Sequence, residues 1–80
     1  MDIQDYIRRC CLWLSEYCGY TILDKEITDE KEWGIEFYVE RNNVKYTFIS
    51  FFINNKTIFE VYKGCGDEAV FIKTTTMWGL

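Results

Sequence analysis

Trp33–Ile53, with the sequence WGIEFYVERNNVKYTFISFFI, is the stretch of the chain that decides the fold. Its first part, up to Glu40, alternates apolar residues with others, and the apolar set is Ile35, Phe37 and Val39. This period of two is typical of a strand with one buried face. Arg41-Asn42-Asn43 predicts a turn, because Asn tolerates positive φ. Val44–Ile53 is apolar on both faces from Phe48 onward, which predicts the central strand of a sheet.

The remaining C-terminal sequence repeats this pattern of strand and turn. Asn54-Asn55-Lys56 predicts a second turn, and Thr57–Lys63 a further strand. The two glycines of Gly64-Cys65-Gly66-Asp67 predict a third turn. Ala69–Met77 is rich in β-branched residues and predicts the last strand, before a tail of three residues, 78–80. Turns this short favour antiparallel pairing of successive strands as a meander.

The first eighteen residues predict an amphipathic helix. Asp2 is placed to cap its start, and Gly19 to end it as a left-handed residue. The apolar stripe has helical spacing and consists of Ile3, Ile7, Cys10, Leu14 and Cys18. After Gly19 we expect a short extended run over Tyr20–Leu23 and a charged connection over Asp24–Glu32.

The sequence therefore predicts one domain, residues 1–80, of the α+β class. In it, one N-terminal amphipathic helix packs on a four- to five-stranded antiparallel meander, and one sheet face has no cover. Parity alone does not say which face the helix covers, nor whether Trp33 and Trp78 belong to the core or to a contact surface.

The composition argues against most catalytic and metal-binding functions. The chain has no histidine, which removes the commonest general base and metal ligand. Its cysteines, at positions 10, 11, 18 and 65, lack the paired spacing of structural zinc sites and are interpreted as reduced thiols. We expect no catalytic residue, cofactor or metal. Cys65, in a polar glycine turn near Lys63, leaves a thiol enzyme as an alternative.

The start of the chain is acidic, without the positive region of a signal peptide. No apolar run is long enough to cross a bilayer. We therefore expect a cytoplasmic protein that does not bind membranes.

Charge is distributed unevenly along the chain, whose net charge is −4. Asp24–Glu40 holds seven acids and two lysines, whereas the residues from Arg41 onward have five bases and three acids. The overall charge argues against direct nucleic-acid binding and suits a basic protein partner. We expect an acidic surface that carries an aromatic ring, and the predicted partner-binding residues are Asp29, Glu30, Glu32, Glu36, Tyr38 and Glu40. A solvated loop and a soluble strand face remain the alternative interpretation.

The opening, Met1-Asp2-Ile3-Gln4-Asp5-Tyr6-Ile7-Arg8, and the predicted layout resemble small phage-encoded anti-CRISPR proteins. The resemblance implies an inhibitor in the host cytosol that offers acidic residues to the groove with which a CRISPR effector, or another nucleic-acid-binding protein, reads DNA. That role would fall on the five acids of the predicted site. The chain differs from the most acidic of these inhibitors because it has no strongly acidic C-terminal helix.

The predicted function is thus that of a small non-enzymatic inhibitor that binds a protein and imitates nucleic acid. The alternative is a homo-oligomer, such as a homodimer, or an adaptor that pairs through the exposed sheet face or an edge strand. For that alternative the candidate residues of one face are Phe51, Ile53, Phe59 and Val61.

Overall fold

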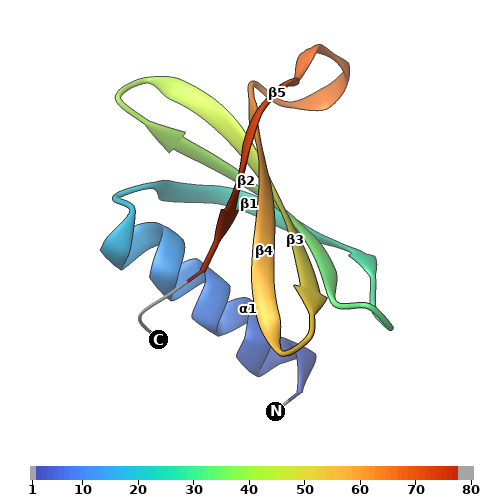
Figure 1. Cartoon of the computed structure of the whole chain (residues 1–80). Coiled ribbons are helices and arrows are strands. Elements are labelled where there is room, and N and C mark those ends of the chain that lie inside the picture. The colour runs from blue at the N-terminus through green and yellow to red at the C-terminus, as the bar shows by residue number, and fades with distance from the viewer. Residues whose placement is uncertain (1, 78–80) are drawn as a thin grey trace.

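The computed structural model describes residues 2–77 and has one helical segment packed on an open five-stranded antiparallel sheet (Figure 1). This confirms the predicted α+β class. The elements are α1 (Ile3–Leu12), η1 (Trp13–Tyr17), β1 (Thr21–Asp29), β2 (Gly34–Arg41), β3 (Val44–Ile53), β4 (Lys56–Lys63), η2 (Gly66–Glu68) and β5 (Val70–Thr76). The predicted tail, with Trp78, and Met1 lie outside the described residues.

The helix begins and ends where the sequence predicts. The Asp2 side chain caps α1 by accepting a hydrogen bond from the Asp5 amide at 2.9 Å. The last turn, η1, has π-helical hydrogen bonding, and Gly19 follows it with φ +77°, which only glycine adopts readily. In residues 2–77, no helix has both the length and the apolar character to cross a membrane.

The strands lie in chain order, β1-β2-β3-β4-β5, so β3 is central as predicted. The two asparagine pairs form the predicted turns, since Asn42, Asn43, Asn54 and Asn55 all have positive φ. Both turns connect adjacent strands whose pairing continues without irregularity, as in Arg41 opposite Val44 and Ile53 opposite Lys56.

The hydrophobic core lies between the helix and one face of the sheet, which we call the covered face. The sheet residues fully buried there include Ile35, Phe37, Val39, Phe59 and Val61. From the helical segment they meet an apolar side that is wider than the predicted stripe, with buried Tyr6, Ile7, Cys10, Trp13 and Leu14. Trp33, half-buried, joins this core, since its ring centroid lies 4.9 Å from that of Tyr6.

The opposite face, which we call the open face, has no element of residues 2–77 packed across it as the helix packs across the covered face. The register shows that the residues predicted to form one assembly face are divided between the two. Phe59 and Val61 are buried on the covered face, whereas Phe51 and Ile53 lie on the open face and are exposed. The prediction was wrong because the second Asn-Asn turn puts Phe51 opposite Ile58, not opposite Phe59.

The predicted charged connection over Asp24–Glu32 was also wrong, because most of it belongs to strand β1. Irregularities of register after Ile22 and after Ile27 interrupt the alternation that would have revealed the strand. At an edge of the sheet, β1 is exposed along almost its whole length, so charged residues are tolerated there.

Candidate functional site

The structure divides the predicted partner-binding residues into two places. Glu36, Tyr38 and Glu40 all lie on the open face of β2, because the alternating residues of that strand are buried on the covered face. The other three, Asp29, Glu30 and Glu32, lie where β1 turns into β2. These turn acids are exposed, and the Asp29 Oδ1 accepts backbone hydrogen bonds from Lys31 at 3.1 Å and Glu32 at 3.2 Å.

Strand β1 adds two acids to the open face. Asp24 lies opposite Tyr38, and Glu26 lies directly opposite Glu36. Both belong to the acidic stretch of the sequence, but only the β1–β2 pairing brings them beside the predicted site. Like charges directly opposite each other repel, so this arrangement costs some stability.

Strand β4 supplies a second Glu–Tyr pair that mirrors the first across β3. Glu36 and Glu60 lie opposite Ile49 from its two sides, and Tyr38 and Tyr62 lie opposite Thr47 in the same way. The Tyr38 hydroxyl donates a hydrogen bond to Glu36 Oε2 at 2.6 Å, and the Tyr62 hydroxyl donates one to Glu60 Oε1 at 3.0 Å. The open face therefore carries two tyrosines, each held by the carboxylate two residues before it.

These hydrogen bonds change the acidity of both phenols. The bond to the Glu36 carboxylate, helped by partial desolvation, raises the pKa of Tyr38 to about 12. The bond to Glu60 likewise raises the pKa of Tyr62. Both phenols are thus neutral hydrogen-bond donors at physiological pH, and both carboxylates are their acceptors.

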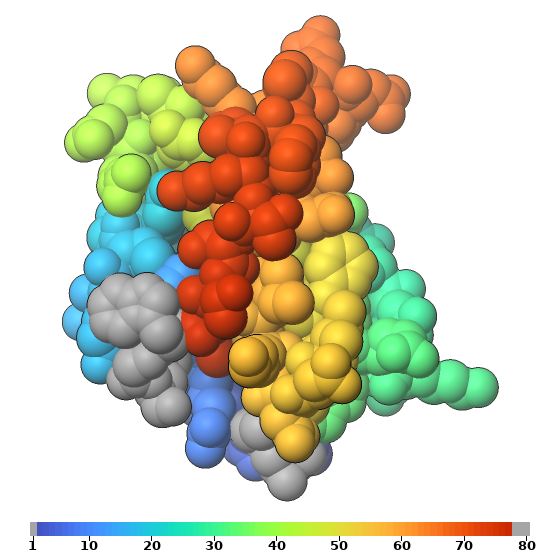
Figure 2. Space-filling view, in the orientation of Figure 1, coloured from blue at the N-terminus to red at the C-terminus, as the bar shows by residue number. Residues whose placement is uncertain are grey.

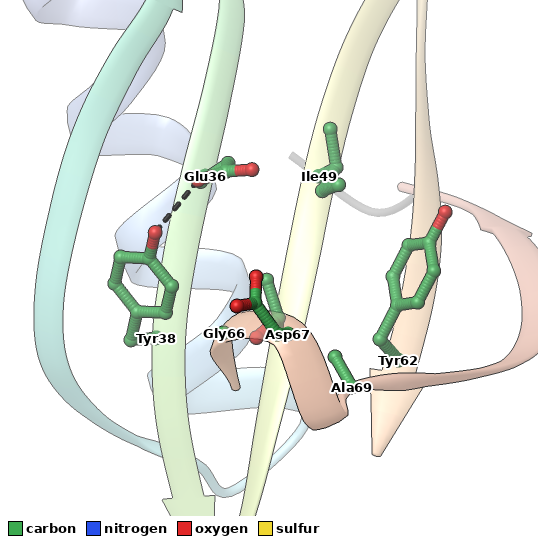
Figure 3. A pocket seen from close by; sticks show the side chains of 8 residues that line it. Glu36, Tyr38, Ile49, Tyr62, Gly66, Asp67 and Ala69 are labelled. Carbon is green, nitrogen blue, oxygen red and sulfur yellow. Dashed lines mark hydrogen bonds between the residues drawn. The ribbon is translucent and has the colours of Figure 1, made fainter. Parts of the chain in front are cut away.

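The loop between β4 and β5 closes a hollow over this part of the face. The loop stands out from the body of the molecule in Figure 2, and the Thr47 hydroxyl ties it to β3 by donating a hydrogen bond to the Gly64 carbonyl at 2.8 Å. The hollow has a volume of about 410 Å³, and its lining is Glu36, Tyr38, Thr47, Ile49, Tyr62, Gly66, Asp67 and Ala69. In Figure 3 the Asp67 carboxylate lies between Tyr38 on one side and Tyr62 on the other.

None of the four cysteines, which all lie within residues 2–77, lines the hollow. Cys10 is fully buried under the sheet, and burial raises the pKa of its thiol to about 12. Burial also raises the pKa values of Cys11 and Cys18. Cys65 is exposed in the β4–β5 loop, just before η2. In the part of the chain that the structure describes, no three Cys, Asp or Glu side chains are grouped so that they could hold a metal ion.

Sequence reasoning missed Glu60, Tyr62 and Asp67 as parts of this surface. A signal for the first two exists, since Glu60-Val61-Tyr62 repeats the Glu-apolar-Tyr spacing of Glu36-Phe37-Tyr38 on a neighbouring predicted strand. No comparable signal marks Asp67, because its position depends on how a loop folds back over the sheet.

Comparison of the chain with protein-family models, with curated proteins and with solved structures finds no match. The candidate site therefore rests on the geometry of the open face itself.

Proposed function

We propose that this protein is non-enzymatic and binds another protein, docking the open face of its sheet on a basic surface of that partner. Binding of this kind would make it an inhibitor like the anti-CRISPR proteins that the sequence resembles. The observation that carries the proposal is the composition of that face. It joins tyrosine rings to carboxylates from three strands, namely Asp24, Glu26, Glu36, Glu40 and Glu60.

The open face keeps a net negative charge, because its five acids outnumber its two lysines, Lys45 opposite Glu40 and Lys56 opposite Ile53. Among residues 2–77, the ion pair is that between Arg8 and Asp5 on the helix, and no carboxylate of the open face takes part in one. Uncompensated charge steers a partner of opposite charge and selects against others. Tyrosine is enriched in protein interfaces because it adds apolar area and a hydroxyl together.

Proteins that bind nucleic acid carry the matching surface, since they cluster Lys and Arg to contact phosphates. A CRISPR effector, the target that the resemblance implies, belongs to this class. Carboxylates held on a sheet face can occupy such a groove as a row of phosphates would, and this supports the proposal of nucleic-acid mimicry.

The test compares two double variants with the same change of charge. In the face variant, Glu36→Lys/Glu60→Lys, both substitutions lie on the open face; in the turn variant, Glu30→Lys/Glu32→Lys, both lie in the β1–β2 turn. Each protein is immobilised, and a bacterial lysate is passed over it. A protein retained by the wild type is then purified, and its affinity for all three proteins is measured by calorimetry.

We expect the face variant to bind about 30-fold more weakly or worse, because reversing a charge leaves its partner unpaired in the interface. The turn variant should stay within about threefold of the wild type. Duplex DNA should compete with the wild type for the partner. Equal affinities of the face variant and the wild type, with both folded by circular dichroism, would overturn the proposal. A loss confined to the turn variant would move the site to Asp29, Glu30 and Glu32.

A second candidate function, assembly through an edge strand, is favoured by the exposure of β5. Its residues Val70, Phe71 and Ile72 are 66%, 51% and 46% exposed. The other edge strand, β1, is less suited to pairing with another chain, because it carries charged residues and two irregularities of register. Sedimentation of the wild type and of Val70→Lys tests this candidate. A wild-type dimer that the variant abolishes supports it, and a wild-type monomer at high micromolar concentration contradicts it.

A further inference from the structure

The hollow on the open face combines three groups that are complementary to one kind of side chain. Two phenol rings stand on either side, carboxylates lie at its rim, and Ile49 provides an apolar floor between β2 and β4. Figure 3 shows the Asp67 carboxylate projecting between the two tyrosines from the loop above. The hollow is therefore aromatic at its walls, apolar at its floor and negatively charged at its entrance.

The carboxylates of the hollow keep hydrogen-bonding capacity for a ligand. Within residues 2–77, Glu36 accepts a hydrogen bond from Tyr38 on Oε2, and its other oxygen has no partner. The Asp67 carboxylate has no partner among the described residues. Since a carboxylate can accept several hydrogen bonds, both remain acceptors for a donor that enters the hollow.

The arrangement of side chains in the hollow favours an organic cation over a metal ion. A divalent cation needs several oxygen ligands within about 2.6 Å of it, and no three acidic or thiol side chains of residues 2–77 are grouped in that way. Two carboxylates beside two phenol rings and an isoleucine suit a planar cation on an apolar stem.

We propose, on the basis of the docking role above, that the hollow is an anchor pocket for an arginine side chain of the partner protein. A guanidinium group is planar, stacks on aromatic rings and offers five donors to carboxylates. Its methylene stem packs over Ile49 while the charged end meets Asp67 and the free oxygen of Glu36.

The chain itself uses this recognition geometry on the covered side of the sheet. The guanidinium carbon of Arg41 lies 4.5 Å from the centre of the Tyr20 ring, and its Nη1 donates a hydrogen bond to the Cys18 carbonyl at 2.7 Å. The hollow offers the same pairing of ring and acceptor to an arginine from outside, with carboxylates in place of the carbonyl.

The test uses three capped tripeptides, acetyl-Gly-X-Gly-amide, in which X is arginine, lysine or citrulline. Citrulline has nearly the shape of arginine but no charge. Each peptide is titrated to about 50 mM into ¹⁵N-labelled protein at constant ionic strength, and amide shifts are followed by NMR. We expect saturable shifts with the arginine peptide at residues 36–38, 47–49, 60–62 and 66–69. The lysine peptide should bind several-fold more weakly, and citrulline at least about tenfold more weakly.

Substitutions locate the binding within the hollow. Asp67→Asn and Glu36→Gln should each weaken arginine binding about fivefold or more, because each removes a charge that the guanidinium contacts. The matched control is Glu40→Gln, which removes the same charge on the same face of β2 without lining the hollow. It should change the affinity less than twofold.

Several outcomes would overturn the anchor pocket. These are equal binding of arginine and citrulline, saturable shifts only at residues 29–32, or no saturable shift for arginine. If the face variant loses partner binding but the arginine peptide causes no shifts at the hollow, the docking role stands and only the anchor pocket is refuted. If the arginine peptide binds the hollow but the partner binds the face variant as tightly as the wild type, the pocket is supported and the docking role is refuted.

Discussion

The two faces of the sheet are built from the same strands but differ in burial and in composition. Phe37 is fully buried on the covered face, and its neighbour Tyr38 stands on the open face with its hydroxyl bonded to Glu36. The covered face is aromatic and aliphatic, with rings in contact such as Trp13 stacked on Phe59 at 5.4 Å. The open face pairs its rings with carboxylates instead. The same period of two thus separates the residues that form the core from those on the uncovered face.

The difference shows how an 80-residue domain can leave one sheet face uncovered without losing its core. A chain of this size buries only about 60% of the surface that its unfolded form exposes, so its stability is limited. One helical segment provides enough apolar area to cover one face only. The other face, which no helix covers in residues 2–77, carries carboxylates from β1, β2 and β4 instead of a second apolar layer.

The largest contrast between the faces should appear when adjacent residues are truncated. Phe37→Ala should lower the free energy of unfolding by about 3–5 kcal/mol, because it opens a cavity in the core. Tyr38→Ala, on the open face, should cost less than about 1 kcal/mol. Urea unfolding followed by tryptophan fluorescence measures both, and equal losses would contradict the division of the faces.

A polar residue buried on the covered face should give the next largest effect. Ser50 is fully buried, and its Oγ accepts a hydrogen bond from the Ile35 amide at 3.2 Å. Ser50→Ala leaves that amide without this acceptor and should cost about 1–3 kcal/mol. Ser15→Ala, on the exposed side of the helical segment, is the matched control and should cost less than about 0.5 kcal/mol. A smaller loss at Ser50 than at Ser15 in urea unfolding would refute this account.

On the open face, a substitution can be stabilising. Glu26 lies directly opposite Glu36, so Glu26→Lys replaces a repulsion by an attraction and should raise the free energy of unfolding by about 0.5 kcal/mol. The gain should shrink in high salt, where charges are screened. Thermal unfolding at low and high salt measures it, with Glu16→Lys on the helical segment as the control. A loss of stability would contradict the proposed repulsion between Glu26 and Glu36.

The smallest effect concerns the Tyr38 phenol at alkaline pH. Its pKa in the folded protein, about 12, lies above the ordinary value of 10.0. The stability linked to this shift is fully present below pH 10.0 and is lost as the pH rises through about 12. We expect the difference in stability between the wild type and Tyr38→Phe to fall over that interval. Absorbance at alkaline pH should show one late-titrating phenol fewer in the variant, and identical titrations would contradict the assignment.

The prediction of the fold was most accurate where local chemistry decides the backbone. Asp2 caps the helix, Gly19 ends it, and the asparagine pairs turn the chain, because each acts through neighbours close in sequence. It was least accurate at β1, which lies at the sheet edge and has an irregular register, so neither burial nor alternation marks it. There, pairing with β2 makes the strand, and this depends on residues far along the chain.

The candidate site divides in the same way. The sequence by itself determined that Glu36, Tyr38 and Glu40 share the face opposite to Phe37, since alternation within one strand needs no tertiary contact. Only the tertiary structure decided that the helix covers the Phe37 side, that β4 places Glu60 and Tyr62 across from them, and that the β4–β5 loop brings Asp67 over the hollow. Those placements follow from register and packing between distant segments, which no local pattern specifies.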